Sequence, residues 1–337
     1  MLKKALFAIL LLAVAAAGGA YWAYQQVINY KNAPSPQNVA QLVTIPSGAN
    51  YHSVTRLLVR DGVIPSSDWA RWLPHIDPSV TQVKAGTFLI EPGLTVAGVF
   101  SQLVNGKQHQ FSITFVEGSR FSEWRVALNK APKLVHKTTE LSEAEIAKAI
   151  GADHEKLEGL LLPETYHYVA GDTDLSILKR AHRQLEDVLD DAWGARNKSV
   201  PIETPYELLT LASIIEKETA IDSEREQVAS VFVNRLHKRM RLQTDPTVIY
   251  GMGDKYDGNI RKKDLRTPTP YNTYVIFGLP PTPIAMPGKA SIEAAANPDK
   301  TPYYYFVANG DGGHKFSKTL TEHNRAVRAY LKKLRNQ

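Results

Sequence analysis

Residues 211–220 read LASIIEKETA, and residues 242–251 read LQTDPTVIYG. The first stretch has the composition of an apolar helix that carries two carboxylates near its end. The second stretch is polar and rich in residues that form turns. An apolar helix bearing acids, followed shortly by such a segment, is the main indication that this chain is an enzyme.

The limits of this helix, and of the helix that follows it, can be predicted from their first residues. Thr204 stands three residues before Glu207 and directly before a proline, which is a capping-box signature for a helix over about 205–220. Ser223 repeats the signature and predicts a second helix over about 224–238. Two consecutive helices with a short joint are therefore expected.

Glu216 and Glu218 lie in the last turns of the first helix, where the helix dipole disfavours a carboxylate by about 0.3 to 1 kcal/mol. On a helical wheel they border opposite edges of the apolar stripe, and Lys217 points to solvent. The stripe consists of Leu208, Leu211, Ala212 and Ile215. Desolvation at such an edge raises a carboxyl pKa toward that of a general acid. Either glutamate is a catalytic candidate by this reasoning, and a structural ion pair is the alternative for each.

The two stretches and the motifs around them resemble the catalytic region of the YceG-like endolytic murein transglycosylases, which cut the glycan strands of the bacterial cell wall. The specific part covers residues 160–324, with PETY at 163–166, EKET at 216–219, YNTY at 271–274 and GLPPTPIAMPG at 278–288. The resemblance implies that Glu218, the second glutamate of EKET, is the catalytic residue. Thr282 stands where the family commonly has glycine, and Met286 where a small polar residue is usual.

The resemblance also implies a sugar groove lined by amides, carboxylates and aromatic rings. The implied substrate-binding residues are Glu216, Gln243, Thr244, Asp245, Tyr271, Asn272, Tyr274 and Glu164. Asp245 directly precedes a proline, and a helix N-cap is the favoured interpretation of that pair. Packed tyrosines are the alternative for the YNTY motif, and a capping or turn role is the alternative for Glu164.

The implied reaction needs one acid that protonates the glycosidic oxygen while the C1–O bond breaks. In lytic transglycosylases the 6-hydroxyl of the muramic sugar then attacks its own C1, and the same glutamate acts as the base. The product is a 1,6-anhydro end, and the intramolecular nucleophile lowers the entropic cost. A hydrolytic muramidase with a second carboxylate at Asp245, Glu216 or Glu164, and a non-catalytic peptidoglycan-binding scaffold, are the alternatives.

The N-terminus indicates the compartment. Two lysines precede residues 5–24, a run without charge that is long enough to span a membrane as a helix. Trp22 and Tyr24 lie at its far end, where aromatic side chains favour the membrane interface. A cleaved signal peptide is the alternative, but the run exceeds the typical length of a signal core. We expect a single-pass inner-membrane protein with a cytoplasmic N-terminus and a periplasmic main part.

The remainder of the chain predicts an α+β fold in several parts. Strand, turn and helix recur, with strands at 41–45, 88–91 and 111–116 and helices at 51–60 and 95–104. Near the C-terminus we expect a buried strand, a hairpin around 310–313 and a helix. The expected parts are a transmembrane anchor (1–25), a linker (26–40), a LysM-like α/β module (41–110) and a YceG-like catalytic domain (111–337). A plain spacer domain is the alternative to the LysM-like module.

Composition limits the chemistry. The chain has 337 residues, of which 43% are hydrophobic, which allows two or three domains with a sizeable core. The absence of cysteine excludes disulfides and thiolate sites, and His314 and His323 lack the spacing of a zinc motif. The net charge of +6 suits anionic partners. We expect peptidoglycan strands, the membrane and, by resemblance, peptidoglycan synthases as partners, with no nucleic acid, metal or cofactor.

Overall fold

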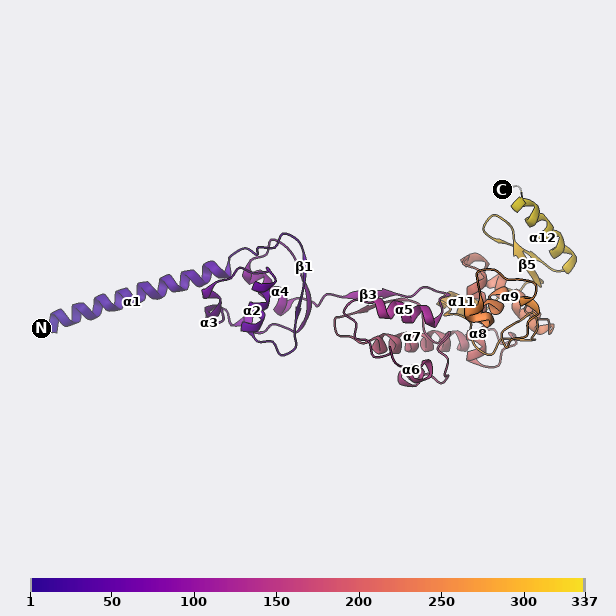
Figure 1. Cartoon of the computed structure of the whole chain (residues 1–337), viewed down its shortest axis with the longest axis horizontal. Helices are drawn as coiled ribbons and strands as arrows, with labels where there is room; N and C mark the ends of the chain where they lie inside the picture. Colours follow the sequence, from indigo (N-terminus) through magenta and orange to yellow (C-terminus); the bar gives the residue numbers. More distant parts are fainter. Residues whose placement is uncertain (1, 336–337) are drawn as a thin grey trace. The chain divides into compact units, whose positions relative to one another are not determined.

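The computed structural model describes residues 2–335, which form two compact units (Figure 1). The first unit holds the residues up to Phe111 together with Tyr168–Gly171, and the second holds Ser112–His167 and the residues from Asp172 onward. The predicted boundary between residues 110 and 111 lies next to this division. The units, unlike the predicted segments, are not continuous in sequence. The predicted mixture of helices and strands is confirmed, and the strands form separate two-stranded sheets.

The N-terminal helix α1 spans Leu2–Lys31 and is long and apolar enough to cross a membrane, since an 18-residue window of it has a mean hydropathy of 2.0. It continues beyond residue 25, so the first part of the expected linker is helical. Val27 is buried near the end of the helix, and the Trp22 ring meets the Trp69 ring at a centroid distance of 5.5 Å. The end of α1 is therefore part of the packed first unit.

The segment that follows α1 is not a free extended linker either. Pro34 forms a β-bridge with Thr95, and the Ser35 hydroxyl donates a hydrogen bond to the Val63 carbonyl over 2.7 Å. The Ser35 amide also donates to the Leu94 carbonyl over 2.7 Å, which satisfies a polar backbone group of this non-helical segment. The linker predicted over 26–40 is thus replaced by a helix end and a packed segment.

The rest of the first unit is a small two-stranded sheet covered by helices. Its elements are β1 (Gln41–Ile45), α2 (Tyr51–Arg60), η1 (Asp68–Trp72), α3 (Leu73–Ile76), η2 (Pro78–Thr81), β2 (Gly86–Ile90) and α4 (Val96–Asn105). β1 and β2 are antiparallel, with Val43 opposite Phe88. Both side chains are buried with Leu58 and Phe100 of the helices. The strand at 41–45 and the helix at 51–60 are confirmed, and the LysM-like character of the unit stays a prediction.

The second unit is mainly helical. Its elements are β3 (Phe111–Thr114), α5 (Phe121–Lys130), α6 (Glu143–Ile150), β4 (Thr165–Tyr168), α7 (Asp174–Gly194), α8 (Pro205–Glu218), α9 (Asp222–His237), α10 (Asp245–Met252), η3 (Gly253–Lys255), η4 (Asp264–Arg266), α11 (Lys289–Ala296), β5 (Tyr305–Ala308), β6 (His314–Ser317) and α12 (Leu320–Arg335). Of β3 and β4, all but the end residues Phe111 and Tyr168 belong to this unit. β3 pairs with β4, and β5 pairs with β6 in the predicted C-terminal hairpin. The strand β5 is half-buried rather than buried, as its residues are partly exposed along their whole length.

Helix α8 is the central element of the second unit. It begins as predicted, since the Thr204 hydroxyl accepts a hydrogen bond from the Glu207 amide over 3.2 Å. Its predicted apolar stripe is too narrow, because Leu209, Ser213 and Ile214 are also buried. The reason is tertiary: α7, α9, α10 and α11 all pack against α8. α9 begins at Asp222, so the predicted cap at Ser223 is wrong, because Ser223 already lies in the first turn.

The proline-rich segment at 278–288 is irregular, as expected, and it is fixed in the core. The Ile284 amide donates to the Ser213 hydroxyl over 3.0 Å, and the Met286 amide donates to the Ser119 carbonyl over 2.9 Å. The Met286 sulfur also accepts a hydrogen bond from the Gly159 amide. This buried contact explains a methionine where the family usually has a small polar residue. The segment thereby ties α8 to the loop that follows β3.

Candidate active site

A pocket of about 340 Å³ lies in the second unit at the end of α8. Its walls come from α8, α9, the segment leading into α10, the YNTY segment, β5 and α12, several of which are labelled close together in Figure 1. It is lined by Glu218, Phe232, Arg235, Leu242, Gln243, Thr244, Asp245, Tyr274, Tyr305, Phe306, Leu320 and His323. Glu218 and four predicted groove residues thus share one pocket.

Glu218 is the last residue of α8, and its side chain is half-buried in this pocket. One carboxyl oxygen accepts a hydrogen bond from the Thr244 hydroxyl. Burial raises the pKa of Glu218 above its ordinary value, and the charge of Asp245 raises it further. The Thr244 hydrogen bond, the second largest cause after burial, lowers this pKa, as do the charges of His314 and Arg235, but burial prevails. A carboxyl group whose pKa is raised in a pocket has the property that a general acid needs.

The start of α10 differs from the sequence prediction. The N-cap position belongs to Thr244, and its side chain makes no cap because it turns to Glu218. Asp245 is the first helical residue, and its carboxylate accepts a hydrogen bond from the Tyr274 hydroxyl over 2.7 Å. The predicted cap at Asp245 is therefore wrong. Its carboxylate remains in the pocket, where it acts on Glu218 through its charge.

Gln243 reaches the pocket through an unusual backbone. Its φ angle is 52°, in the left-handed region that residues with side chains rarely adopt. The Gln243 amide donates to the Thr273 carbonyl over 3.2 Å, and the Thr244 amide donates to the Thr273 hydroxyl over 3.1 Å. These bonds fix the strained turn against the YNTY segment. Strain that the surrounding structure maintains is typical of functional sites.

Arg235 is a pocket residue that the sequence analysis missed. Its buried guanidinium donates to the Tyr304 carbonyl and to the Leu242 carbonyl, each over 2.6 Å. It also lies 5.2 Å from the centre of the Tyr305 ring. A signal was present in the sequence, since Arg235 lies on the same helix face as Phe232, three residues earlier. A cation on an apolar helix face is expected to have a buried partner.

His323 and Tyr305 were also missed as pocket residues. Their rings stack with centroids 5.3 Å apart. Burial lowers the pKa of the His323 imidazole, and the charge of Arg235 lowers it further. Its buried Nδ1 atom has no hydrogen-bond partner within residues 2–335. The Nδ1 atom of His314, in contrast, is hydrogen-bonded to the Glu224 carboxylate over 2.7 Å.

Two predicted glutamates lie outside this pocket. One carboxyl oxygen of Glu216 accepts hydrogen bonds from the Gly288 amide over 3.0 Å and from the Ser291 hydroxyl over 2.7 Å. This carboxylate anchors the end of the proline-rich segment and the start of α11. Glu164 is exposed, and its carbonyl accepts a hydrogen bond from the Phe115 amide over 3.1 Å. The hydrogen bonds of these two residues therefore stabilise the fold.

Two predicted groove residues of the YNTY motif, Tyr271 and Asn272, also lie outside the pocket. The Tyr271 hydroxyl is 3.0 Å from the Thr282 hydroxyl, so the family departure at position 282 provides a partner. Asn272 is buried and donates to the carbonyls of Asp264 and Thr267. Its side-chain oxygen accepts a hydrogen bond from the Tyr274 amide over 3.0 Å. Asn272 thereby positions Tyr274, which alone of the motif lines the pocket.

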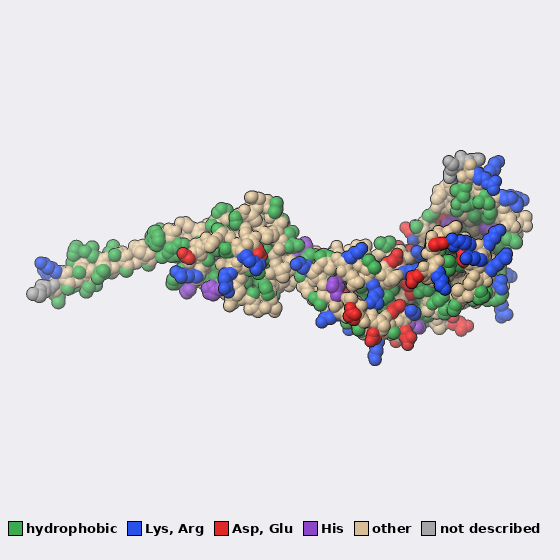
Figure 2. Space-filling view, in the orientation of Figure 1, with side chains coloured by type: hydrophobic (Ala, Val, Ile, Leu, Met, Phe, Trp, Pro, Cys, Tyr) green, Lys and Arg blue, Asp and Glu red, His purple; other side chains and the backbone are tan. Residues whose placement is uncertain are grey.

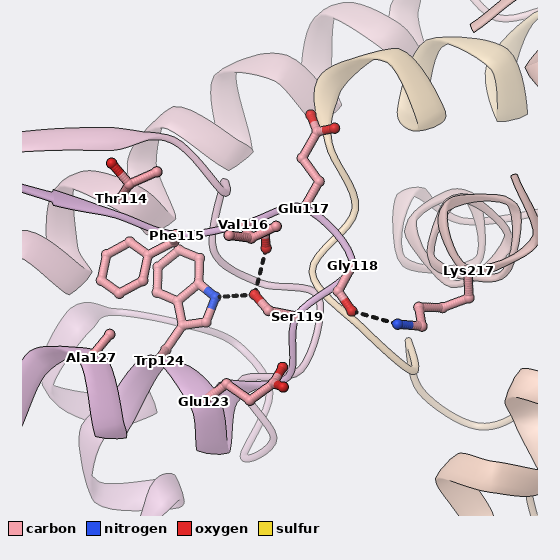
Figure 3. A pocket seen from close by; sticks show the side chains of 10 residues that line it. All are labelled: Thr114, Phe115, Val116, Glu117, Gly118, Ser119, Glu123, Trp124, Ala127 and Lys217. Carbon is pink, nitrogen blue, oxygen red and sulfur yellow. Dashed lines mark hydrogen bonds between the residues drawn. The ribbon is translucent and has the colours of Figure 1, made fainter. Parts of the chain in front are cut away.

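A second hollow of about 370 Å³ lies beside the loop after β3 (Figure 3). Its aromatic wall is Phe115 stacked on Trp124, with ring centroids 3.6 Å apart. Lys217 is exposed, as expected, and its ammonium group also donates to the Gly118 carbonyl over 2.9 Å (Figure 3). The Trp124 indole donates to the Ser119 hydroxyl over 2.9 Å. These polar groups bond one another, so the hollow is a structural joint between the loop and α8.

The hydrogen bond between Thr244 and Glu218 gives a testable pH dependence. Replacement of Thr244 by valine removes a contact that lowers the pKa of Glu218, so that pKa should rise further. A general acid works in its protonated form, and the loss of kcat/KM at high pH should therefore move to higher pH. The measurement is the pH profile of glycan-strand cleavage. Thr210→Val is the matched control, because its buried hydroxyl bonds only the Tyr206 carbonyl; a high-pH limb that stays in place in T244V would contradict the assignment.

Known proteins are similar to this chain over most of its length. The model of the YceG-like family matches residues 43–329. An endolytic murein transglycosylase of Bacillus subtilis is 32% identical over 306 residues, which cover 86% of this chain and 84% of that protein. One from Streptococcus pneumoniae is 27% identical over 96% of this chain, which spans only 64% of the length of that relative.

A solved structure is similar as well. The crystal structure of a putative yceG-like protein of Listeria monocytogenes superimposes with a TM-score of 0.54 at 31% sequence identity. The match covers 86% of this chain and 99% of that protein. Sequence and structure therefore point to the same family.

Proposed function

Because the chain belongs to the YceG-like family, and its relatives are named endolytic murein transglycosylases, we propose that it cuts peptidoglycan strands from within. The bond cleaved is the one from N-acetylmuramic acid to N-acetylglucosamine, and the product carries a 1,6-anhydro-muramic end. Such internal cuts limit the length of nascent strands. The observation that carries this proposal is the half-buried Glu218 with its raised pKa in a polar pocket.

In the first step, the protonated Glu218 donates its proton to the glycosidic oxygen. The C1–O bond breaks as this proton is transferred, and positive charge develops on the muramic ring. Glu218 is left as a carboxylate, which the Thr244 hydroxyl stabilises by its hydrogen bond. The nearby charge of Asp245 favours the developing positive charge on the sugar by simple electrostatics.

In the second step, the 6-hydroxyl of the muramic sugar bonds to its own C1. The Glu218 carboxylate removes the hydroxyl proton and returns to its starting state. Atoms and charge balance without water or a cofactor. The ring of Tyr305 lines the pocket, where it stacks on His323 and lies 5.2 Å from the Arg235 guanidinium.

The helix α1 could anchor the enzyme in the membrane. Its length and hydropathy are compatible with a single span. We propose that the two N-terminal lysines stay in the cytoplasm and that both units lie on the periplasmic side of the inner membrane. An anchored enzyme would work beside the synthases that extrude new strands. The first unit would then bind glycan as a LysM-like module.

Mass spectrometry of the products tests the proposed reaction. The full chain in detergent micelles is incubated with uncrosslinked glycan strands, and the expected products are internal fragments with 1,6-anhydro ends. Fragments with reducing ends would instead indicate a hydrolase, for which Asp245 in the same pocket is the available second carboxylate. Intact strands after prolonged incubation would reject enzymatic cleavage and favour a binding scaffold.

A further inference from the structure

A separate groove lies beside the catalytic pocket and has no part in the reaction described above. It has a volume of about 730 Å³ and lies between the β5–β6 hairpin and α12. Tyr303 and Phe316 form an aromatic part of its wall, with ring centroids 5.8 Å apart. The small side chains of Ala326 and Ala329 line it on the α12 side and leave the space open. Its volume is within the range of ligand sites.

The groove is cationic. Lys315, Lys318 and Arg325 line it, and none of the three side chains forms an ion pair or hydrogen bond within residues 2–335. The groove also contains one acidic residue, Glu322, one of whose carboxyl oxygens accepts hydrogen bonds from the amides of Lys318 and Thr319. The three cations outnumber this single carboxylate. Figure 2 shows Lys and Arg side chains over this end of the second unit. The three cations are therefore available for an anionic ligand.

The groove and the catalytic pocket share the same elements. β5, β6 and α12 contribute residues to the groove, and β5 and α12 also contribute to the pocket. Glu322 lines the groove, and its neighbour His323 lines the pocket, so one turn of α12 faces both. A ligand bound along this turn can reach both sites at once. The occupant should accordingly belong to the same strand that is cut.

We propose that this groove binds the peptide stem of a muramic sugar in the strand being cleaved. This inference rests on the proposed function and adds a preference for strands that carry peptides. The carboxylates of the stem complement the three free cations. The aromatic wall accepts the apolar part of the stem. A concave groove suits a chain-like ligand of this kind better than a flat anionic membrane.

The test compares two substrates and two matched variants of the full chain in detergent micelles. The substrates are glycan strands with their peptide stems and the same strands after an amidase has removed the stems. The groove variant combines Lys315→Gln, Lys318→Gln and Arg325→Gln. The control combines Arg328→Gln, Lys332→Gln and Arg335→Gln, which remove the same charge from α12 side chains outside the groove lining.

The unchanged chain should cleave strands that carry stems with a kcat/KM about tenfold higher than that for stripped strands. A tenfold factor corresponds to ~1.4 kcal/mol. The groove variant should lose this preference, with its rate on stripped strands unchanged within about twofold. The control variant should keep the preference. Higher salt should reduce the preference, because it screens exposed charges. Equal cleavage of both strands by the unchanged chain, or equal losses in both variants, would overturn the proposal.

A binding measurement separates this proposal from the proposed reaction. The Glu218→Gln chain is titrated calorimetrically with a soluble muramyl peptide and with N-acetylmuramic acid without a peptide. Only the first should bind, and the three groove substitutions should weaken its binding about tenfold. Such binding, together with no cleavage of either strand by the unchanged chain, would reject the reaction alone. Cleavage of both strands without peptide binding would reject the groove alone, as would a groove that binds only anionic lipid.

Discussion

Replacement of Glu218 by glutamine should lower kcat for the cleavage of glycan strands by roughly 10²- to 10⁴-fold, the usual contribution of a general acid. The amide has nearly the same shape and can still accept the hydrogen bond from Thr244. Its N–H protons are not acidic enough to be transferred to the glycosidic oxygen. The measurement is a single-turnover rate with uncrosslinked strands, analysed by mass spectrometry of the fragments.

Glu216→Gln is the matched control for this change. Glu216 lies two residues earlier on α8, and its carboxylate accepts two hydrogen bonds from the Gly288 and Ser291 region. A glutamine oxygen can accept the same bonds, so cleavage should stay within a few-fold of the unchanged chain. The unfolding midpoint of the Glu218 variant should not fall, because glutamine removes a buried carboxyl group without adding volume. Activity of E218Q equal to that of the unchanged chain would reject Glu218 as the acid.

Replacement of Arg235 by methionine should lower the free energy of unfolding by roughly 2 to 5 kcal/mol. The guanidinium is buried and holds the carbonyls of Tyr304 and Leu242, each over 2.6 Å. Methionine fills much of the volume but leaves both carbonyls without a donor. The segment at Leu242 also carries Thr244 toward Glu218, so the cleavage rate should fall at least about tenfold. Urea unfolding followed by circular dichroism measures the first effect.

Lys238→Met is the control for this substitution. Lys238 is an exposed residue at the end of the same helix, and replacing it should change the free energy of unfolding by less than about 0.5 kcal/mol. A value for Arg235→Met as small as that of the control would show that the two carbonyls find other partners. In that case Arg235 would not be the clamp that fixes the pocket.

Local features of the fold follow from the sequence where a few neighbouring residues decide them. Thr204 defines the start of α8, and the limits of α2 at Tyr51–Arg60 follow from its amphipathic pattern. The end of α1 was misplaced, because packing against the first unit extends it to Lys31. The cap at Asp245 was misplaced because Thr244 turns to Glu218, 26 residues earlier in the sequence. Local patterns cannot register such long-range contacts.

The sequence by itself determined the family, the order of most elements and the presence of two carboxylates at the end of α8. Helical spacing alone could not separate the two, because both border the same apolar stripe, and only the family resemblance favoured Glu218. Tertiary structure separates them: Thr244 and Asp245 approach Glu218, whereas Gly288, 72 residues after Glu216, approaches that carboxylate. The physical reason is that the environment of a carboxyl group, and hence its pKa, depends on atoms brought near it by folding. The same applies to Arg235, which became a pocket residue only when distant backbone carbonyls converged on it.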